Sequence, residues 1–93
     1  MLFVAHCIDN PDSVAIRMAN RQAHLDHLRA QGEHVKLAGP LLADDGGMVG
    51  SLLILDFADR AGVEMFLHDD PYGKAGLFAS VVVHAFRQVL PEG

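Results

Sequence analysis

The chain has 93 residues, of which 51% are hydrophobic and 20% charged, with a formal net charge of −5. This length supports one hydrophobic core, so we expect a single domain over residues 1–93. The seven basic residues are dispersed, which excludes nucleic acid as an expected partner because the acidic surface repels phosphates. We expect a cytoplasmic protein without a membrane partner: the lone Cys7 makes no internal disulfide, the opening apolar run is too short for a signal peptide, and no apolar run reaches the roughly 18 residues of a membrane span.

A strand and a long helix are predicted in the first third of the chain. The apolar run Leu2–Ile8 ends at a turn sequence of Asp, Asn and Pro and indicates a strand. Asp12 or Ser13 can cap a following helix by accepting a backbone N–H bond, and Gly32 is a plausible stop. We therefore expect the first helix over residues 13–31.

A hairpin, a second helix and a last strand follow. Strands are predicted at His34–Leu42 and Met48–Phe57, because the glycines between them can take the positive φ of a tight connection. Asp59 can cap a helix that extends to about Leu67, and residues 69–73 predict an irregular connection. The final strand is expected over Gly76–Val89, with three valines at its centre.

The predicted order is β-α-β-β-α-β, the ferredoxin-like arrangement of an α+β domain with a four-stranded antiparallel sheet and two helices on one face. In the last strand, apolar residues occupy both alternating sets, Phe78, Val82 and Phe86 in one and Ala79, Val81, Val83 and Val89 in the other. A sheet that is apolar on both faces needs a second cover, which is most simply another copy of the sheet. We therefore predict a homodimer through the open sheet face.

The first predicted helix carries cationic residues beside its apolar face. A helical wheel places one apolar stripe toward the sheet, composed of Val14, Met18, Leu25 and Leu28. Arg21 falls inside this stripe, and Arg17 and His24 lie along one flank. In a structural interpretation, the arginines extend to the sheet edge or pair with acids, and a backbone carbonyl satisfies His24. In a functional one, the arginines hold a carboxylate, phenolate or enolate in a cleft while His24 transfers a proton.

A second candidate cluster is Asp70-Pro71-Tyr72. Proline restricts the preceding Asp70 to extended geometry, so the carboxylate has a defined direction. If it reached His24, it would orient the ring and stabilise its protonated form. The alternative is an ordinary turn in which Asp70 acts as a cap. Tyr72 and Ser51 are candidate substrate-binding residues by proximity only, and the glycines near Ser51 could equally serve hairpin geometry or close approach to a ligand.

Six histidines raise the question of a metal site, which we do not expect. His24 and His27 share a helix side only approximately, and no set of three or four converging ligands is evident. No cofactor is expected either. Cys7 is predicted to be a small core residue, and the remaining histidines are expected at the surface or dimer face: His6, His34, His68 and His84.

Taken in order, these segments resemble the YciI-like (YCII-related) family over nearly the whole chain. No single motif is specific, but the ordered set is: Arg17-x-x-x-Arg21-x-x-His24-Leu25, Ala38-Gly39-Pro40-Leu41, Gly50-Ser51 and Asp70-Pro71-Tyr72-x-x-Ala75-Gly76-Leu77. The resemblance implies a dimeric α/β barrel with a cleft in each subunit and a His and Asp pair at His24 and Asp70. It also implies lyase-like chemistry on small aromatic or hydroxyquinone compounds, including elimination of chloride.

Three functional hypotheses follow. The first is a cofactor-independent lyase or isomerase in which His24 transfers a proton, Asp70 orients it, and Arg17 and Arg21 stabilise the developing anion. The second is a non-catalytic dimer that binds a small anionic metabolite or serves in regulation, since a fold of this kind is compatible with many functions. The third, a cofactor-free monooxygenase, is implied by related dimeric α/β barrels and requires an oxidisable substrate.

Overall fold

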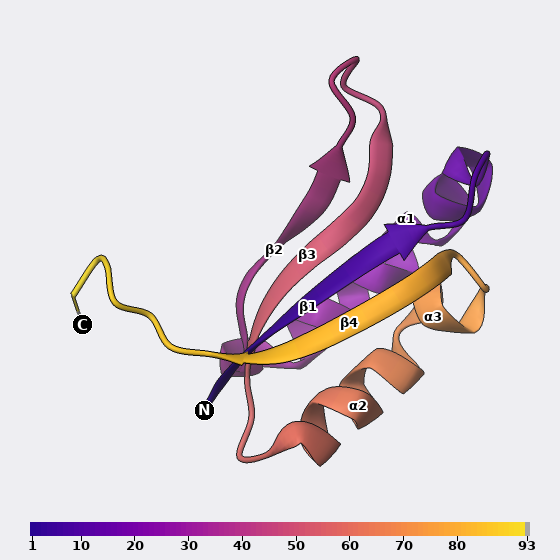
Figure 1. Cartoon of the computed structure of the whole chain (residues 1–93). Coiled ribbons are helices and arrows are strands. Elements are labelled where there is room, and N and C mark those ends of the chain that lie inside the picture. Colours follow the sequence, from indigo (N-terminus) through magenta and orange to yellow (C-terminus); the bar gives the residue numbers. More distant parts are fainter. Residues whose placement is uncertain (93) are drawn as a thin grey trace.

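The computed structural model describes residues 1–92, and the predicted order of strands and helices is confirmed (Figure 1). No helix in this range is long and apolar enough to cross a membrane. The elements are β1 (Leu2–Asp9), α1 (Val14–Ala30), a 3₁₀ turn η1 (Gly32–His34), β2 (Val35–Leu42), β3 (Met48–Asp56), α2 (Arg60–Asp69), α3 (Pro71–Lys74) and β4 (Phe78–Phe86).

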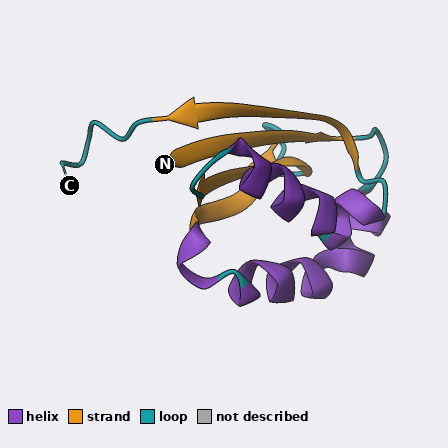
Figure 2. Ribbon diagram, turned by 90° about the horizontal axis from the view of Figure 1, so that it is seen from below, coloured by secondary structure: helices purple, strands orange, loops and turns teal. Residues whose placement is uncertain are grey.

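The sheet has the order β2-β3-β1-β4, and every neighbouring pair is antiparallel. Its two central strands, β1 and β3, are short apolar runs, and Ala5 of β1 lies opposite Leu53 of β3 and Val83 of β4. The helices cover one face of the sheet (Figure 2). The core between sheet and helices contains Phe3, Ala5, Cys7, Leu28, Leu53, Leu55, Val63 and Phe66. This is the predicted ferredoxin-like fold.

The face of the sheet opposite the helices is also rich in apolar side chains. The register places His6 between Leu52 of β3 and Val82 of β4, and the neighbouring Val4 lies opposite Ile54. Val82 is 46% exposed, although an apolar residue in a strand is normally packed. Val82 and Phe86 therefore share this uncovered face as predicted, whereas Phe78 packs against the core instead, because the register shifts between Ile8 and Asp9.

Two boundaries near the C-terminus differ from the prediction. The last strand occupies Phe78–Phe86 instead of residues 76–89, since Gly76 has a φ of +72° and belongs to the turn before the strand. Residues 87–92 extend away from the sheet (Figure 1), and Val89 is 72% exposed. The connection over residues 69–73 is also more regular than predicted, because α3 begins at Pro71, where a missing N–H costs nothing.

The orientation of α1 was predicted wrongly. Val14 and Met18 are 49% and 53% exposed, whereas Arg17 and His24 are buried at 3% and 7%. The helix is rotated so that the flank with Arg17 and His24 faces the sheet. Of the expected apolar stripe, only the C-terminal residues Leu25 and Leu28 are covered. Arg21, expected inside the core stripe, is exposed. The rotation is possible because carboxylates from other elements pair with the buried side chains.

Capping agrees with the prediction at three of the helix ends. Asp59 accepts a hydrogen bond from the Gly62 N–H at 3.1 Å and caps α2, and Asp70 accepts from the Tyr72 N–H and caps α3. Gly32, with a φ of +57°, follows the C-terminus of α1. Ser13 occupies the N-cap of α1 but makes no capping bond, since its hydroxyl donates to the Pro11 carbonyl instead.

Candidate functional site

His24 and Asp70 form a buried pair between α1 and the α2–α3 junction. The His24 Nδ1 lies 2.8 Å from Asp70 Oδ1, and the side chains are 8% and 0% exposed. Asp70 has the extended backbone that a following proline imposes, with φ −64° and ψ 126°. The same Oδ1 accepts the Tyr72 N–H at 3.0 Å. Asp70 is thus both the cap of α3 and the partner of the histidine, so the two interpretations of the sequence are compatible.

Tyr72 lies against the His24 ring. The ring centroids are 3.9 Å apart with an interplanar angle of 14°, and the tyrosine is 2% exposed. Burial raises the pKa of the Tyr72 phenol, and the nearby Arg17 guanidinium partly opposes this effect. The phenol is therefore protonated at neutral pH and can donate a hydrogen bond. The stack also limits rotation of the imidazole.

Arg17 is held by a carboxylate at the end of β1. Its Nε and Nη2 donate to the two oxygens of Asp9, both at 2.8 Å, and Nη2 also donates to the Ser51 hydroxyl at 2.9 Å. Burial alone would lower the pKa of Arg17, but the Asp9 contacts outweigh it and raise the pKa above its usual value. The Arg17 Cζ lies 4.7 Å from the Tyr72 ring centroid. The guanidinium is therefore charged, and its charge is balanced locally by Asp9.

These side chains form one wall of a cavity of about 270 Å³ between α1 and the β2–β3 hairpin. The polar wall contains Arg17, Arg21, His24, Ser51 and Tyr72, and the rest is Leu25, Leu28, Leu53, Met48, Ala38, Gly39 and Pro40. The described structure shows no hydrogen-bond partner for His24 Nε2, the ring nitrogen opposite the one that contacts Asp70. A small ring compound bound here would meet apolar side chains on one side and several donors with one imidazole nitrogen on the other.

The structure brings together the six residues singled out in the sequence, which are Arg17, Arg21, His24, Ser51, Asp70 and Tyr72. All of them line the cavity except Asp70, which lies behind His24. Sequence reasoning missed Asp9, whose side chain is only 6% exposed. Two signals could have found it. Asp9 continues the alternation of Phe3, Ala5 and Cys7 toward the helix face, and a buried arginine requires a carboxylate partner.

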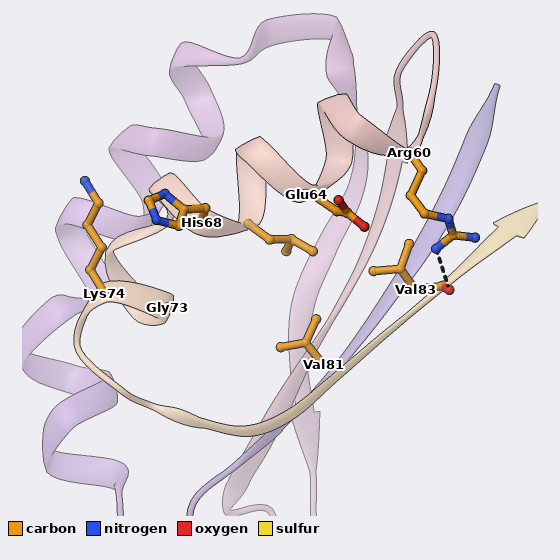
Figure 3. Close-up of a pocket in the computed structure, with 8 residues that line it drawn as sticks. Arg60, Glu64, His68, Gly73, Lys74, Val81 and Val83 are labelled. Atoms are coloured by element: carbon orange, nitrogen blue, oxygen red, sulfur yellow. Dashed lines mark hydrogen bonds between the residues drawn. The ribbon is translucent and has the colours of Figure 1, made fainter.

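A larger, more open hollow of about 600 Å³ lies between α2 and β4 (Figure 3). Arg60 crosses it and donates to the Val83 carbonyl at 2.9 Å, and His68, Lys74 and Glu64 lie at its rim. It has no buried pair of titratable side chains. We place the candidate site in the smaller cavity, because perturbed, paired and buried polar groups distinguish functional clefts better than size does. Within residues 1–92 no group of three or more His, Cys, Asp or Glu side chains could hold a metal ion.

The fold matches that of known proteins. In structure, the chain resembles 5-chloro-2-hydroxyhydroquinone dehydrochlorinase (TftG) from Burkholderia phenoliruptrix AC1100, solved with 2,5-dihydroxybenzoquinone, with a TM-score of 0.87 and 36% identity over 94% of each chain. Rv0793 from Mycobacterium tuberculosis has the same fold, with a TM-score of 0.56 and 18% identity over 96% of each chain. These neighbours are ferredoxin-like dimeric α/β barrel proteins.

The family follows from sequence as well. The model of the YCII-related domain matches residues 1–87. Protein YciI of Escherichia coli O6:H1 is 33% identical over 96% of this chain and 99% of its own length. The chain therefore belongs to the YCII-related family, as its ordered motifs indicated.

Proposed function

We propose that this protein is a cofactor-independent enzyme of the lyase or isomerase type that transfers a proton on a small anionic or aromatic compound. The observation that carries the proposal is the buried His24–Asp70 contact of 2.8 Å, with the opposite face of the pair open to a cavity. The dehydrochlorinase with which the chain shares 36% identity acts on a hydroxylated ring, which supports the same substrate class here.

Asp70 determines how His24 can act. A carboxylate on Nδ1 favours the tautomer in which Nδ1 carries the proton, and this leaves the Nε2 lone pair free to accept one from the substrate. The imidazolium that forms is then stabilised by the Asp70 charge. In an elimination of HCl from a chlorinated hydroxyhydroquinone, one hydroxyl proton first moves to the ring carbon that carries chlorine, which gives the keto tautomer. His24 then takes a second hydroxyl proton while the carbon–chlorine bond breaks and its electron pair leaves with chloride. Proton return to solvent completes the cycle.

The remaining polar residues are proposed to bind and orient the substrate. Because Asp9 already balances Arg17, the exposed Arg21 is the cation better placed to meet an anionic group at the cavity mouth. Ser51 and Tyr72 contribute hydroxyl groups on the inner wall. A volume of about 270 Å³ lies just below the range of roughly 300–1,000 Å³ for ligand sites and suits a single-ring compound.

The test is chloride release from 5-chloro-2-hydroxyhydroquinone together with binding of 2,5-dihydroxybenzoquinone, measured on the wild type, His24→Ala and His68→Ala. His68 is the matched control, since its side chain is 84% exposed. We expect turnover by the wild type and His68→Ala and a loss of about 100-fold or more in His24→Ala. A fully active His24→Ala variant would refute the mechanism. Wild-type binding without any turnover of chlorinated or isomerisable ring compounds would favour the alternative, a non-catalytic metabolite-binding module.

We also propose that the chain forms a homodimer through the open face of its sheet. The uncovered apolar side chains on β1, β3 and β4 support this, as do dimeric neighbours of the same fold. Sedimentation of Val82→Asp and Met65→Asp tests it, because both wild-type residues are exposed, at 46% and 68%, but only Val82 lies on this face. We expect a dimeric wild type and Met65→Asp and a monomeric Val82→Asp. A wild-type monomer at micromolar concentration would contradict the proposal.

A further inference from the structure

The Asp9–Arg17 pair is unusual for a chain of this size because both side chains are almost fully buried, at 6% and 3% exposure. Removing two charges from water costs several kcal/mol per ion, and replacing such a pair by apolar residues is often neutral or stabilising. The pair is therefore poorly explained as a source of stability. Its geometry offers a better explanation, since the two-pronged contact fixes the guanidinium in position and in plane.

Asp9 lies outside the cavity wall. Its side chain lines a separate hollow of about 340 Å³ beside the β1–α1 loop, and only its partner Arg17 faces the candidate site. From there Arg17 donates to Ser51 at 2.9 Å and lies 4.7 Å from the centre of the Tyr72 ring. The contacts by which Asp9 can influence the shape of the candidate site therefore run through the guanidinium.

Arg17 in turn contacts the groups that face the ligand. The Ser51 hydroxyl has its orientation set by the Arg17 donor, and the Tyr72 ring is in contact with the guanidinium and with the His24 ring at 3.9 Å. If Asp9 lost its charge, an unpaired guanidinium that is 3% exposed would be expected to move toward solvent. Ser51 and Tyr72 would then lose the contact that orients them.

We propose that Asp9 is a positioning residue of the candidate site, which holds Arg17 against Tyr72 and Ser51 so that the inner wall of the cavity is preorganised for ligand. The inference rests on the proposed function for its consequence on binding, but the positioning itself can be measured without a ligand. It assigns a role to a side chain at the end of β1 that touches no bound compound.

The experiment compares Asp9→Asn with Asp12→Asn. Both changes remove one negative charge and preserve size, and Asp12 is an exposed residue of the next loop whose φ of 56° asparagine tolerates. The chain has one tyrosine, so the ring signals in an aromatic NMR spectrum of tyrosine-labelled protein belong to Tyr72 alone. The second measurement is the dissociation constant of 2,5-dihydroxybenzoquinone by calorimetry, under conditions in which both variants are folded.

We expect Asp9→Asn to shift the Tyr72 ring signals and to weaken binding of the probe by roughly tenfold, the loss of about one charge-assisted hydrogen bond. Asp12→Asn should match the wild type in both. Unchanged Tyr72 signals in Asp9→Asn would overturn the inference. So would an Asp9→Asn variant that is less stable than the wild type but binds the probe with the same dissociation constant. If the wild type does not bind the probe, the ligand class of the proposed function fails, and the Tyr72 signals still decide whether Asp9 positions Arg17.

Discussion

Replacement of Asp70 by alanine should destabilise the fold by about 1 kcal/mol, the balance of two losses and one gain. The change removes the cap on the Tyr72 N–H, worth about 1 kcal/mol, and the contact with His24, worth about 1.5–3 kcal/mol for a bond to a charged group. One gain opposes these losses. Asp70 Oδ2 is buried without a hydrogen-bond partner, and its removal relieves a penalty of about 1–3 kcal/mol.

Asp70→Asn removes the charge of the side chain and keeps its shape. Its amide oxygen can still accept from Tyr72 and His24, so we expect a stability within about 1 kcal/mol of the wild type. Urea unfolding followed by circular dichroism measures both variants, with Asp69→Ala as control because the Asp69 side chain is 54% exposed. A loss below about 0.5 kcal/mol in Asp70→Ala, the range of ordinary surface changes, would refute this assignment of its contacts.

Two further predictions concern β1 and its neighbour β3. A Cβ at Gly50 would overlap the Cys7 carbonyl oxygen, whereas one at Gly39 meets nothing within 4 Å. Gly50→Ala should therefore lower the free energy of unfolding by about 3 kcal/mol and Gly39→Ala by about 0.5 kcal/mol or less. Equal midpoints of urea unfolding for the two variants would contradict this. Burial, followed by the charge of Asp70, raises the pKa of Cys7 from 9.0 to about 12, so iodoacetamide at pH 8 should label the thiol only after unfolding. Because the unfolded thiol ionises first, the free energy of unfolding should fall by about 1.4 kcal/mol per pH unit above pH 9, and this contribution should be missing in Cys7→Ala.

The fold was predictable because its strands and helices follow local signals. Short apolar runs marked the strands, and Asp59 and Gly32 marked helix ends through capping and positive φ, which depend on neighbouring residues only. The last strand was predicted too long because Val89 is apolar although it is exposed. The hydrophobic periodicity of a sequence shows which residues are apolar, but it does not show whether a second layer of the structure covers them.

Most members of the candidate site were predictable from the sequence, as was the pairing of His24 with Asp70, but Asp9 and its pairing with Arg17 were not. The helical wheel placed Arg17 and His24 on a flank of the apolar stripe, but it could not show that this flank is the side of the helix that faces the sheet. Their burial depends on Asp9 and Asp70, which come from the end of β1 and from the start of α3. Such pairings arise from tertiary structure. The family resemblance implied the pair of His24 and Asp70, and the strand alternation at Asp9 was a signal for the other pair that the sequence analysis did not use.

The pairing of His24 with Asp70 joins residues 46 positions apart, and the Arg17–Ser51 bond spans 34. Closing loops of this length has an entropic cost that must be met before such contacts stabilise the chain. We therefore expect the site to form late in folding, together with the β1–β4 pairing, which joins residues as far apart as Leu2 and Phe86. Substitutions within the site should mainly accelerate unfolding and leave the folding rate nearly unchanged, because contacts that are absent from the transition state affect only the unfolding rate. The ability of the cavity to bind a ligand would therefore indicate that the whole chain has folded.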